Sequence, residues 1–232
     1  MAIKPILFNT EMVKAILDGR KTVTRRLVKF LSRKNPNWTG YVKDGLMLYN
    51  GRNEPCIRKV PYQPGDIMYV RETWQYLYEL DGNEQIIEGT GKYYYAATDT
   101  IPFDTYVDAS GVTHERVPWH PSIHMPKEAA RIWLKATDVR VERLQDITED
   151  GVWNEGFRFT PPCLTRVSAD GHTCDLDGPC TSHIKYCDMT MGELFGRELW
   201  NSTIKKSDLS CYGWNANPWV WVIEFERWEK PE

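Results

Sequence analysis

Short apolar or alternating segments, separated by long polar stretches, constrain the fold of this chain more than any other feature of its sequence. Helical patterns are fewer: one follows Asn9 or Thr10, either of which can cap it, one follows Thr148, and one covers residues 190–201. Many short strands with few helices favour an α+β protein built on a small β-barrel over a doubly wound sheet. The expected strands cover residues 6–8, 21–27, 67–70, 92–97, 132–136, 139–143 and 218–225.

Three polar, turn-rich stretches interrupt this pattern, at about 30–60, 75–118 and 159–188. We interpret them as insertions in a single domain that spans residues 1–232, because 232 residues suit one domain with insertions. Insertions between the strands of a small barrel are expected at its rim. Residues 46–49 read as one arm of a hairpin within the first insertion.

The aromatic content and the net charge of the chain limit the kinds of partner that it can bind. The 10 Trp and 12 Tyr residues supply either a thick aromatic core or rings that line a pocket for a flat ligand such as a nucleobase. A net charge of −3 disfavours a general coat for long nucleic acids, since phosphate neutralisation needs excess positive charge. A local basic patch is nevertheless present, formed by Arg20, Lys21, Arg25 and Arg26.

The sequence shows no basic segment followed by an apolar run at its start, and no run of 18 apolar residues. These features predict a cytoplasmic protein with no membrane partner. Cysteines should then be reduced. The third insertion, as a small Cys-rich subdomain, could hold a structural zinc, free thiols or disulfides, and no cofactor is expected for catalysis. The candidate zinc ligands are Cys163, Cys174, Cys180 and Cys187.

Several motifs resemble one known family, the ASCH domains of the PUA-like superfamily. Residues 19–26, Gly-Arg-Lys-Thr-Val-Thr-Arg-Arg, follow an amphipathic helix as in the opening motif of that family. The segments 64–70, 146–156 and 220–225 resemble its second strand, its later helix and its final strand. Residues 71–74 and 119–126 resemble the longer, phage- or prophage-type members.

The resemblance implies a PUA-like β-barrel with flanking helices and a pocket for RNA or a modified nucleoside. Some small members hydrolyse N4-acetylcytidine to cytidine and acetate, and their motif assigns Lys21 as base, Thr24 as nucleophile and Glu155 as acid. Other members bind or cleave RNA, so a noncatalytic RNA-binding module or an RNA-cleaving protein that uses the basic patch is the alternative. This chain also departs from the small members by its length and by its double arginine, Arg25-Arg26.

The chemistry of these side chains agrees with an amidohydrolase. A threonine hydroxyl needs a base, and Lys21 serves as one only when neutral, which burial and the neighbouring arginines favour. The non-functional alternative is that residues 21–26 form a solvated strand face and that Glu155 is an ordinary acidic residue on a helix surface. Arg71 and Glu72 either read base edges or pair with each other, and Trp74 either stacks on a base or joins the core.

Overall fold

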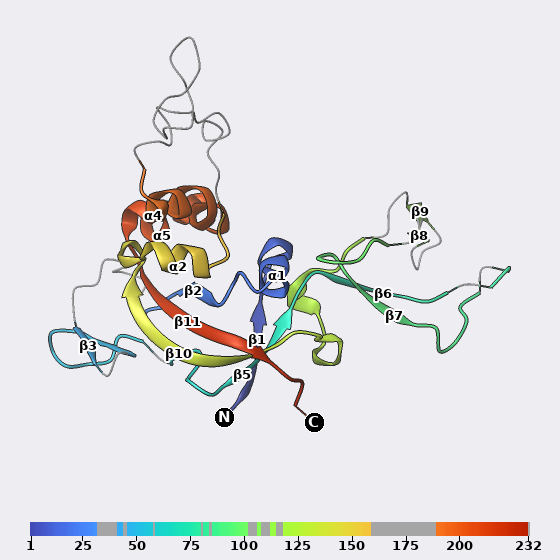
Figure 1. Cartoon of the computed structure of the whole chain (residues 1–232), viewed down its shortest axis with the longest axis horizontal. Helices are drawn as coiled ribbons and strands as arrows, with labels where there is room; N and C mark the ends of the chain where they lie inside the picture. The colour runs from blue at the N-terminus through green and yellow to red at the C-terminus, as the bar shows by residue number, and fades with distance from the viewer. Residues whose placement is uncertain are drawn as a thin grey trace, which may run out of the picture. The chain divides into compact units, whose positions relative to one another are not determined.

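The computed structural model divides the chain into two compact units, each formed from separated segments. Unit 1 comprises Met1–Gly19, Pro64–Thr137 and Phe225–Glu232, and unit 2 comprises Arg20–Gln63 and Asp138–Glu224. The mixture of helices and strands confirms the α+β class (Figure 1). The structure describes residues 1–31, 41–43, 46–57, 59–79, 81–83, 85–101, 106–107, 112–114, 118–158 and 189–231.

Five strands pair in the order β1-β5-β10-β11-β2. Strand β1 (Ile3–Leu7) runs parallel to β5 (Ile67–Arg71), and β5 runs antiparallel to β10 (Trp133–Arg143). Strand β11 (Trp219–Trp228) runs antiparallel to β2 (Val23–Leu27), and β10 and β11 each contribute residues to both units. In the described part of the chain this order ends at β1 and β2, so closure into a PUA-like barrel stays a prediction.

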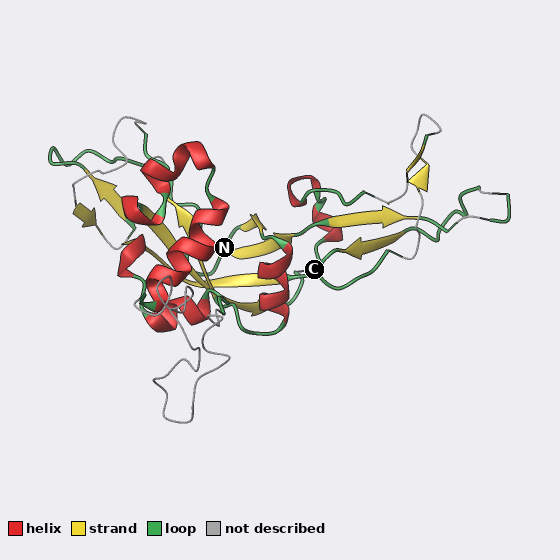
Figure 2. Ribbon diagram, turned by 90° about the horizontal axis from the view of Figure 1, so that it is seen from above, coloured by secondary structure: helices red, strands yellow, loops and turns green. Residues whose placement is uncertain are grey.

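Unit 1 contains β1, β5 and helix α1 (Thr10–Leu17), which begins as expected after Asn9 because that side chain accepts from the free N–H of Met12. A separate hairpin is formed by β6 (Trp74–Leu77) and β7 (Lys92–Tyr95), seen in Figure 2 as two antiparallel arrows. Its aromatic rings pack on one another, with Tyr76 and Tyr93 centred 4.6 Å apart. The described part of the second predicted insertion, 75–118, therefore contains most of this hairpin.

Unit 2 contains β2, the hairpin of β3 (Tyr41–Lys43) and β4 (Met47–Tyr49), and the helices α2 (Glu149–Asn154), α4 (Met191–Leu194) and α5 (Leu209–Tyr212). A six-residue π-helix, η5 (Phe195–Trp200), continues α4. The core of unit 2 joins Val23 of β2 to Val152 of α2 and Phe195 of η5. The remaining short elements are β8 (Tyr106–Val107), β9 (Thr113–His114) and the 3₁₀ turns Ser122–His124, Lys127–Ala129, Leu144–Asp146, Asn201–Thr203, Lys206–Asp208 and Trp214–Ala216.

Several strand boundaries differ from the sequence prediction: β1 begins at Ile3 rather than at residue 6, β7 ends at Tyr95 rather than at residue 97, and β11 extends to Trp228 rather than to residue 225. The strand expected at 21–27 begins only at Val23. The two strands expected at 132–136 and 139–143 form the single strand β10. Its buried positions change from Leu134 and Ala136 to Val139 and Val141, so the alternation shifts phase along the strand and reads as two separate elements.

Gly196 in η5 lies against the buried ring of Trp214. A Cβ added at Gly196 would lie 2.1 Å from Cδ2 of Trp214, a residue that is 7% exposed. We expect Gly196→Ala to lower the free energy of unfolding by about 1–3 kcal/mol, because overpacking outweighs the helix propensity gained. The control is Gly51→Ala, where an added Cβ meets nothing within 4 Å. Denaturant unfolding that finds equal stability for both variants would contradict this contact.

Candidate functional site

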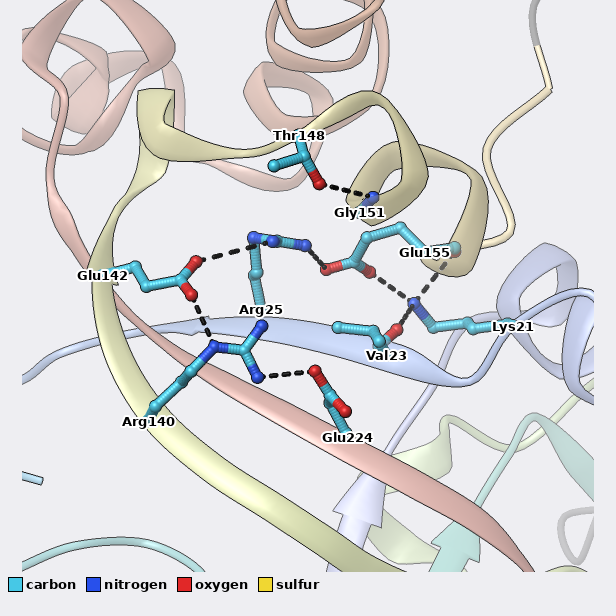
Figure 3. A network of polar contacts seen from close by, with 9 residues as sticks. All are labelled: Lys21, Val23, Arg25, Arg140, Glu142, Thr148, Gly151, Glu155 and Glu224. Atoms are coloured by element: carbon cyan, nitrogen blue, oxygen red, sulfur yellow. Dashed lines mark hydrogen bonds and ion pairs between the residues drawn. The ribbon is translucent and has the colours of Figure 1, made fainter. Parts of the chain in front are cut away.

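The side chains of Lys21 and Glu155, 134 residues apart in sequence, meet in the interior of unit 2. Lys21 forms an isolated bridge with Glu155 just before β2, and Glu155 is the C-cap residue of α2. The Lys21 ammonium donates to Glu155 Oε2 at 2.5 Å, to the Val23 carbonyl at 2.7 Å and to the Glu155 carbonyl at 3.0 Å (Figure 3). The sequence motifs at 19–26 and 146–156 are thereby joined at one point.

Both side chains of this ion pair are removed from water, with exposed fractions of 0% for Lys21 and 3% for Glu155. Burial lowers the pKa of Lys21 below its ordinary value, since desolvation penalises the charged form. The carboxylate of Glu155 opposes this effect and raises the pKa, while the positive charges of Arg26 and Arg25 lower it further. The net direction is downward, which favours the neutral amine that a general base requires.

Arg25 holds the second oxygen of Glu155 and links the pair to a longer chain of charges. Its Nη1 lies 3.3 Å from Glu155 Oε1, and its Nη2 lies 3.7 Å from Glu142 Oε2. Arg140 then contacts both Glu142 and Glu224 at 2.5 Å (Figure 3). The ion pair is therefore the buried end of a series of side chains with alternating charge, drawn from β2, β10, β11 and the end of α2.

Thr24, the neighbour of Arg25 in sequence, has no hydrogen bond to this network. The residue is 0% exposed, and its Oγ1 has no hydrogen-bond partner. Successive side chains of a strand point to opposite faces, so Thr24 shares its face of β2 with Arg26 rather than with Arg25. The charge of Arg26 nevertheless acts on Lys21, so this face lies within electrostatic reach of the ion pair. The structure thus joins two of the three predicted catalytic residues and leaves the third as a buried, unsatisfied hydroxyl.

Most side chains of the basic patch, Arg20, Lys21, Arg25 and Arg26, are removed at least partly from solvent. Lys21 and Arg25 are buried, Arg26 is half-buried, and burial lowers the pKa of Arg26 against the opposing charge of Glu155. Arg20 is half-buried and donates to the carbonyl of Gly156 at 3.1 Å. The alternative of a solvated strand face is therefore wrong for Lys21 and Arg25, and Glu155, at 4% exposed, is not a surface acid.

The predicted substrate-binding residues of unit 1 have other partners. Glu72 is 1% exposed and pairs with Arg131 through two hydrogen bonds of 2.9 Å, so its partner is Arg131 rather than Arg71, which was one of the two alternatives. Arg71 donates to the carbonyl of Ile123. Trp74 packs its ring against Tyr93 and His120, and its Nε1 is buried without an acceptor.

Several charged residues of the site were missed by sequence reasoning. Arg140 and Glu142 alternate along a predicted strand, and Glu224 lies in the predicted closing strand. Alternating charges on neighbouring strands were the available signal, because residues that face one another across strands form ion pairs. The pairing of β10 with β11 is needed to use that signal, and the sequence does not reveal it.

The predicted zinc ligands Cys163, Cys174, Cys180 and Cys187 lie outside the described residues. Within the ranges that the structure describes, no group of three or more His, Cys, Asp or Glu side chains could hold a metal. The cysteines of those ranges are Cys56 and Cys211, and both are half-buried. The zinc interpretation therefore stays a prediction.

Comparison with known proteins adds no relative to this picture: the chain matches no family model, no curated protein and no solved structure. The resemblance to ASCH domains accordingly rests on the sequence motifs alone, at 19–26, 64–74, 119–126, 146–156 and 220–225. No helix in the described part of the chain has the length and apolar character needed to cross a membrane.

Proposed function

We propose that unit 2 carries an amidohydrolase site that removes an acyl group from a modified cytidine such as N4-acetylcytidine. The observation that supports this proposal most is the buried contact of 2.5 Å between Lys21 and Glu155. It joins the base and the acid that the family resemblance assigns. The unsatisfied hydroxyl of Thr24 on the adjoining strand supplies the remaining group.

The chemistry proceeds in two steps. Once the site has opened and Thr24 lies within hydrogen-bond reach of Lys21, neutral Lys21 accepts the proton of the Thr24 hydroxyl while Thr24 Oγ1 attacks the acyl carbonyl. The bond from the carbonyl carbon to N4 breaks, and the leaving amine takes a proton from Glu155, which exchanges protons with Lys21 across their hydrogen bond. Water then hydrolyses the threonine ester, which releases the carboxylic acid and restores the hydroxyl.

Burial of the site sets a condition for this reaction. Thr24 is 0% exposed and Lys21 is 2% exposed, so a substrate reaches them only after the protein around them opens. Exclusion of water after closure would strengthen the electrostatic interactions in the site. The closed arrangement therefore corresponds to the state before substrate entry.

A noncatalytic RNA-binding role is supported less well. Phosphate contacts need cationic side chains that reach the backbone of a nucleic acid. Lys21 and Arg25 instead direct their charge to Glu155 in the interior. Binding or cleavage of RNA by this patch would require that the same ion pairs be broken.

The test is to incubate the full chain with N4-acetylcytidine and to follow release of cytidine and acetate from pH 6 to 11. We expect the rate to rise with pH and to level off below about 10.4, the ordinary lysine value, because the active form has neutral Lys21 and burial lowers its pKa. Lys21→Arg, which keeps the charge, should be inactive at every pH. A panel of acylated nucleosides and nucleotides on which the wild-type protein releases no acid would refute the proposed function.

A further inference from the structure

The carboxylate of Glu155 is held at both of its oxygens by cations. Lys21 contacts Oε2 at 2.5 Å, and Arg25 contacts Oε1 at 3.3 Å. We propose that Arg25 is a positioning residue that fixes the orientation of the Glu155 carboxylate and thereby presents Oε2 to Lys21. This inference rests on the proposed function for its kinetic consequences, but the arrangement that it describes exists without substrate.

Glu155 needs such a support because its own element is short. It is the C-cap of α2, a helix of six residues, and among the described residues the other cation in direct contact with its carboxylate is Lys21. The last torsion of a glutamate side chain has broad minima, so one contact leaves the carboxylate free to rotate. A second cation on the other oxygen removes that freedom. A catalytic group must be held to within a fraction of an ångström of its productive position, so this restriction is required.

Arg25 is in turn held from the opposite side. Its Nη2 faces Glu142 Oε2 at 3.7 Å, and the other oxygen of Glu142 accepts from Arg140. Side-chain exposure increases along this series, from 3% at Arg25 to 25% at Glu142 and 36% at Arg140. The inner member is therefore the one whose loss should affect Glu155 most, and the effect should decrease outward (Figure 3).

The first experiment follows Lys21 by NMR titration of its side chain, using lysine labelled with carbon-13 at Cε, without any substrate. Glu155, Arg25 and Arg26 are the charged groups that act on the pKa of Lys21. If Arg25 positions Glu155, Arg25→Met should lower the titration midpoint of Lys21, because the carboxylate of Glu155 raises this pKa more strongly than the positive charge of Arg25 lowers it. A raised midpoint would show that Arg25 acts only through its charge and would overturn the positioning role. The control is Arg197→Met, which removes an exposed arginine of unit 2 and should leave the midpoint unchanged.

The second experiment is a double-mutant cycle on acid release from N4-acetylcytidine. Arg25→Met alone should reduce kcat by about 10–100-fold, as expected when a catalytic group is misplaced. Combined with Glu155→Gln it should add almost nothing, because Arg25 acts through Glu155. Additive losses would show that Arg25 acts independently of Glu155 and would overturn the proposal.

A conservative variant covers the case in which Arg25→Met does not fold. Arg25→Lys keeps the charge but reaches only one of the two carboxylates that Arg25 contacts, so it should show a smaller loss of kcat than Arg25→Met. Its Lys21 midpoint should fall, because a less firmly held Glu155 raises the pKa of Lys21 less. An Arg25→Lys protein that equals the wild type in both the Lys21 titration and kcat would refute the positioning role. If no variant and no wild-type protein turns over substrate, the titration alone decides the question, and only the proposed function fails.

Discussion

Replacing Glu155 with leucine should lower the free energy of unfolding by about 3–5 kcal/mol, because it leaves the ammonium of Lys21 buried without its counter-charge. The side chain of Lys21 is 0% exposed, so water cannot take the place of the carboxylate in the folded state. Two backbone carbonyls would remain as its acceptors. Equilibrium denaturant unfolding of the full chain measures the effect.

Two further variants show whether this loss belongs to the ion pair. Adding Lys21→Met to Glu155→Leu should recover much of the stability, since an apolar pair of similar volume often replaces a buried ion pair at little cost. The matched control is the surface ion pair of Lys14 and Glu11, whose charged atoms lie 3.0 Å apart. Because this pair is exposed to water, Glu11→Ala should change the free energy of unfolding little. A double variant as unstable as Glu155→Leu would contradict the assignment of the loss to Lys21 and would place it on Arg25, which also loses its contact with Glu155.

The sign of the pH dependence gives an independent check on the same variant. Glu155 raises the pKa of Lys21, so its removal leaves burial and the arginines to lower that pKa further. Between the folded value and about 10.4 the unfolded chain then binds more protons than the folded one, and stability rises with pH. Glu155→Leu should therefore be least stable at low and neutral pH and should gain stability toward pH 10. A penalty that stays constant with pH would exclude a charged Lys21 as its cause.

Local signals in the sequence were sufficient for most helices and strands. Asn9 and Thr148 cap their helices as expected, because the capping bond depends only on residues two or three positions away. The strand at 67–70 was also found, since an apolar run after a Pro-Gly turn needs no distant partner to be recognised. The start of β2 was misplaced because Lys21 bridges to Glu155, a contact that no local pattern encodes.

The candidate site could be predicted from the sequence only in part, for the same reason. Lys21 and Glu155 were named through the resemblance of two separate motifs, and the structure brings them into contact. Their burial was not foreseen from the residues, because a run of lysine and arginines in isolation is typical of a solvated face. The partners of Arg25 and Glu72, which are Glu142 and Arg131, depend on which strands and loops pack together.

Thr24→Val should separate stability from activity more sharply than any other substitution. Valine has nearly the same shape as threonine, and Thr24 is 0% exposed in a strand that favours branched residues. The hydroxyl has no hydrogen-bond partner, so its removal should stabilise the protein by about 1 kcal/mol or more. The same change removes the proposed nucleophile and should reduce kcat for acyl release by about 10³-fold or more. Thermal unfolding and the acetate assay measure the two effects on one sample.

The controls for this experiment distinguish the shape of the side chain from its hydroxyl. Thr24→Ser keeps the hydroxyl but loses a buried methyl group, so it should be less stable than the wild type while it retains measurable turnover. Thr22→Val changes an exposed threonine two residues away and should alter neither quantity much. If Thr24→Val keeps full activity, Thr24 is not the nucleophile. If it instead destabilises the protein, the hydroxyl has a partner such as a buried water. A hydroxyl that is buried without a hydrogen-bond partner lowers the stability of the protein. If the same hydroxyl is essential for turnover, it behaves as expected of a nucleophile in the absence of substrate.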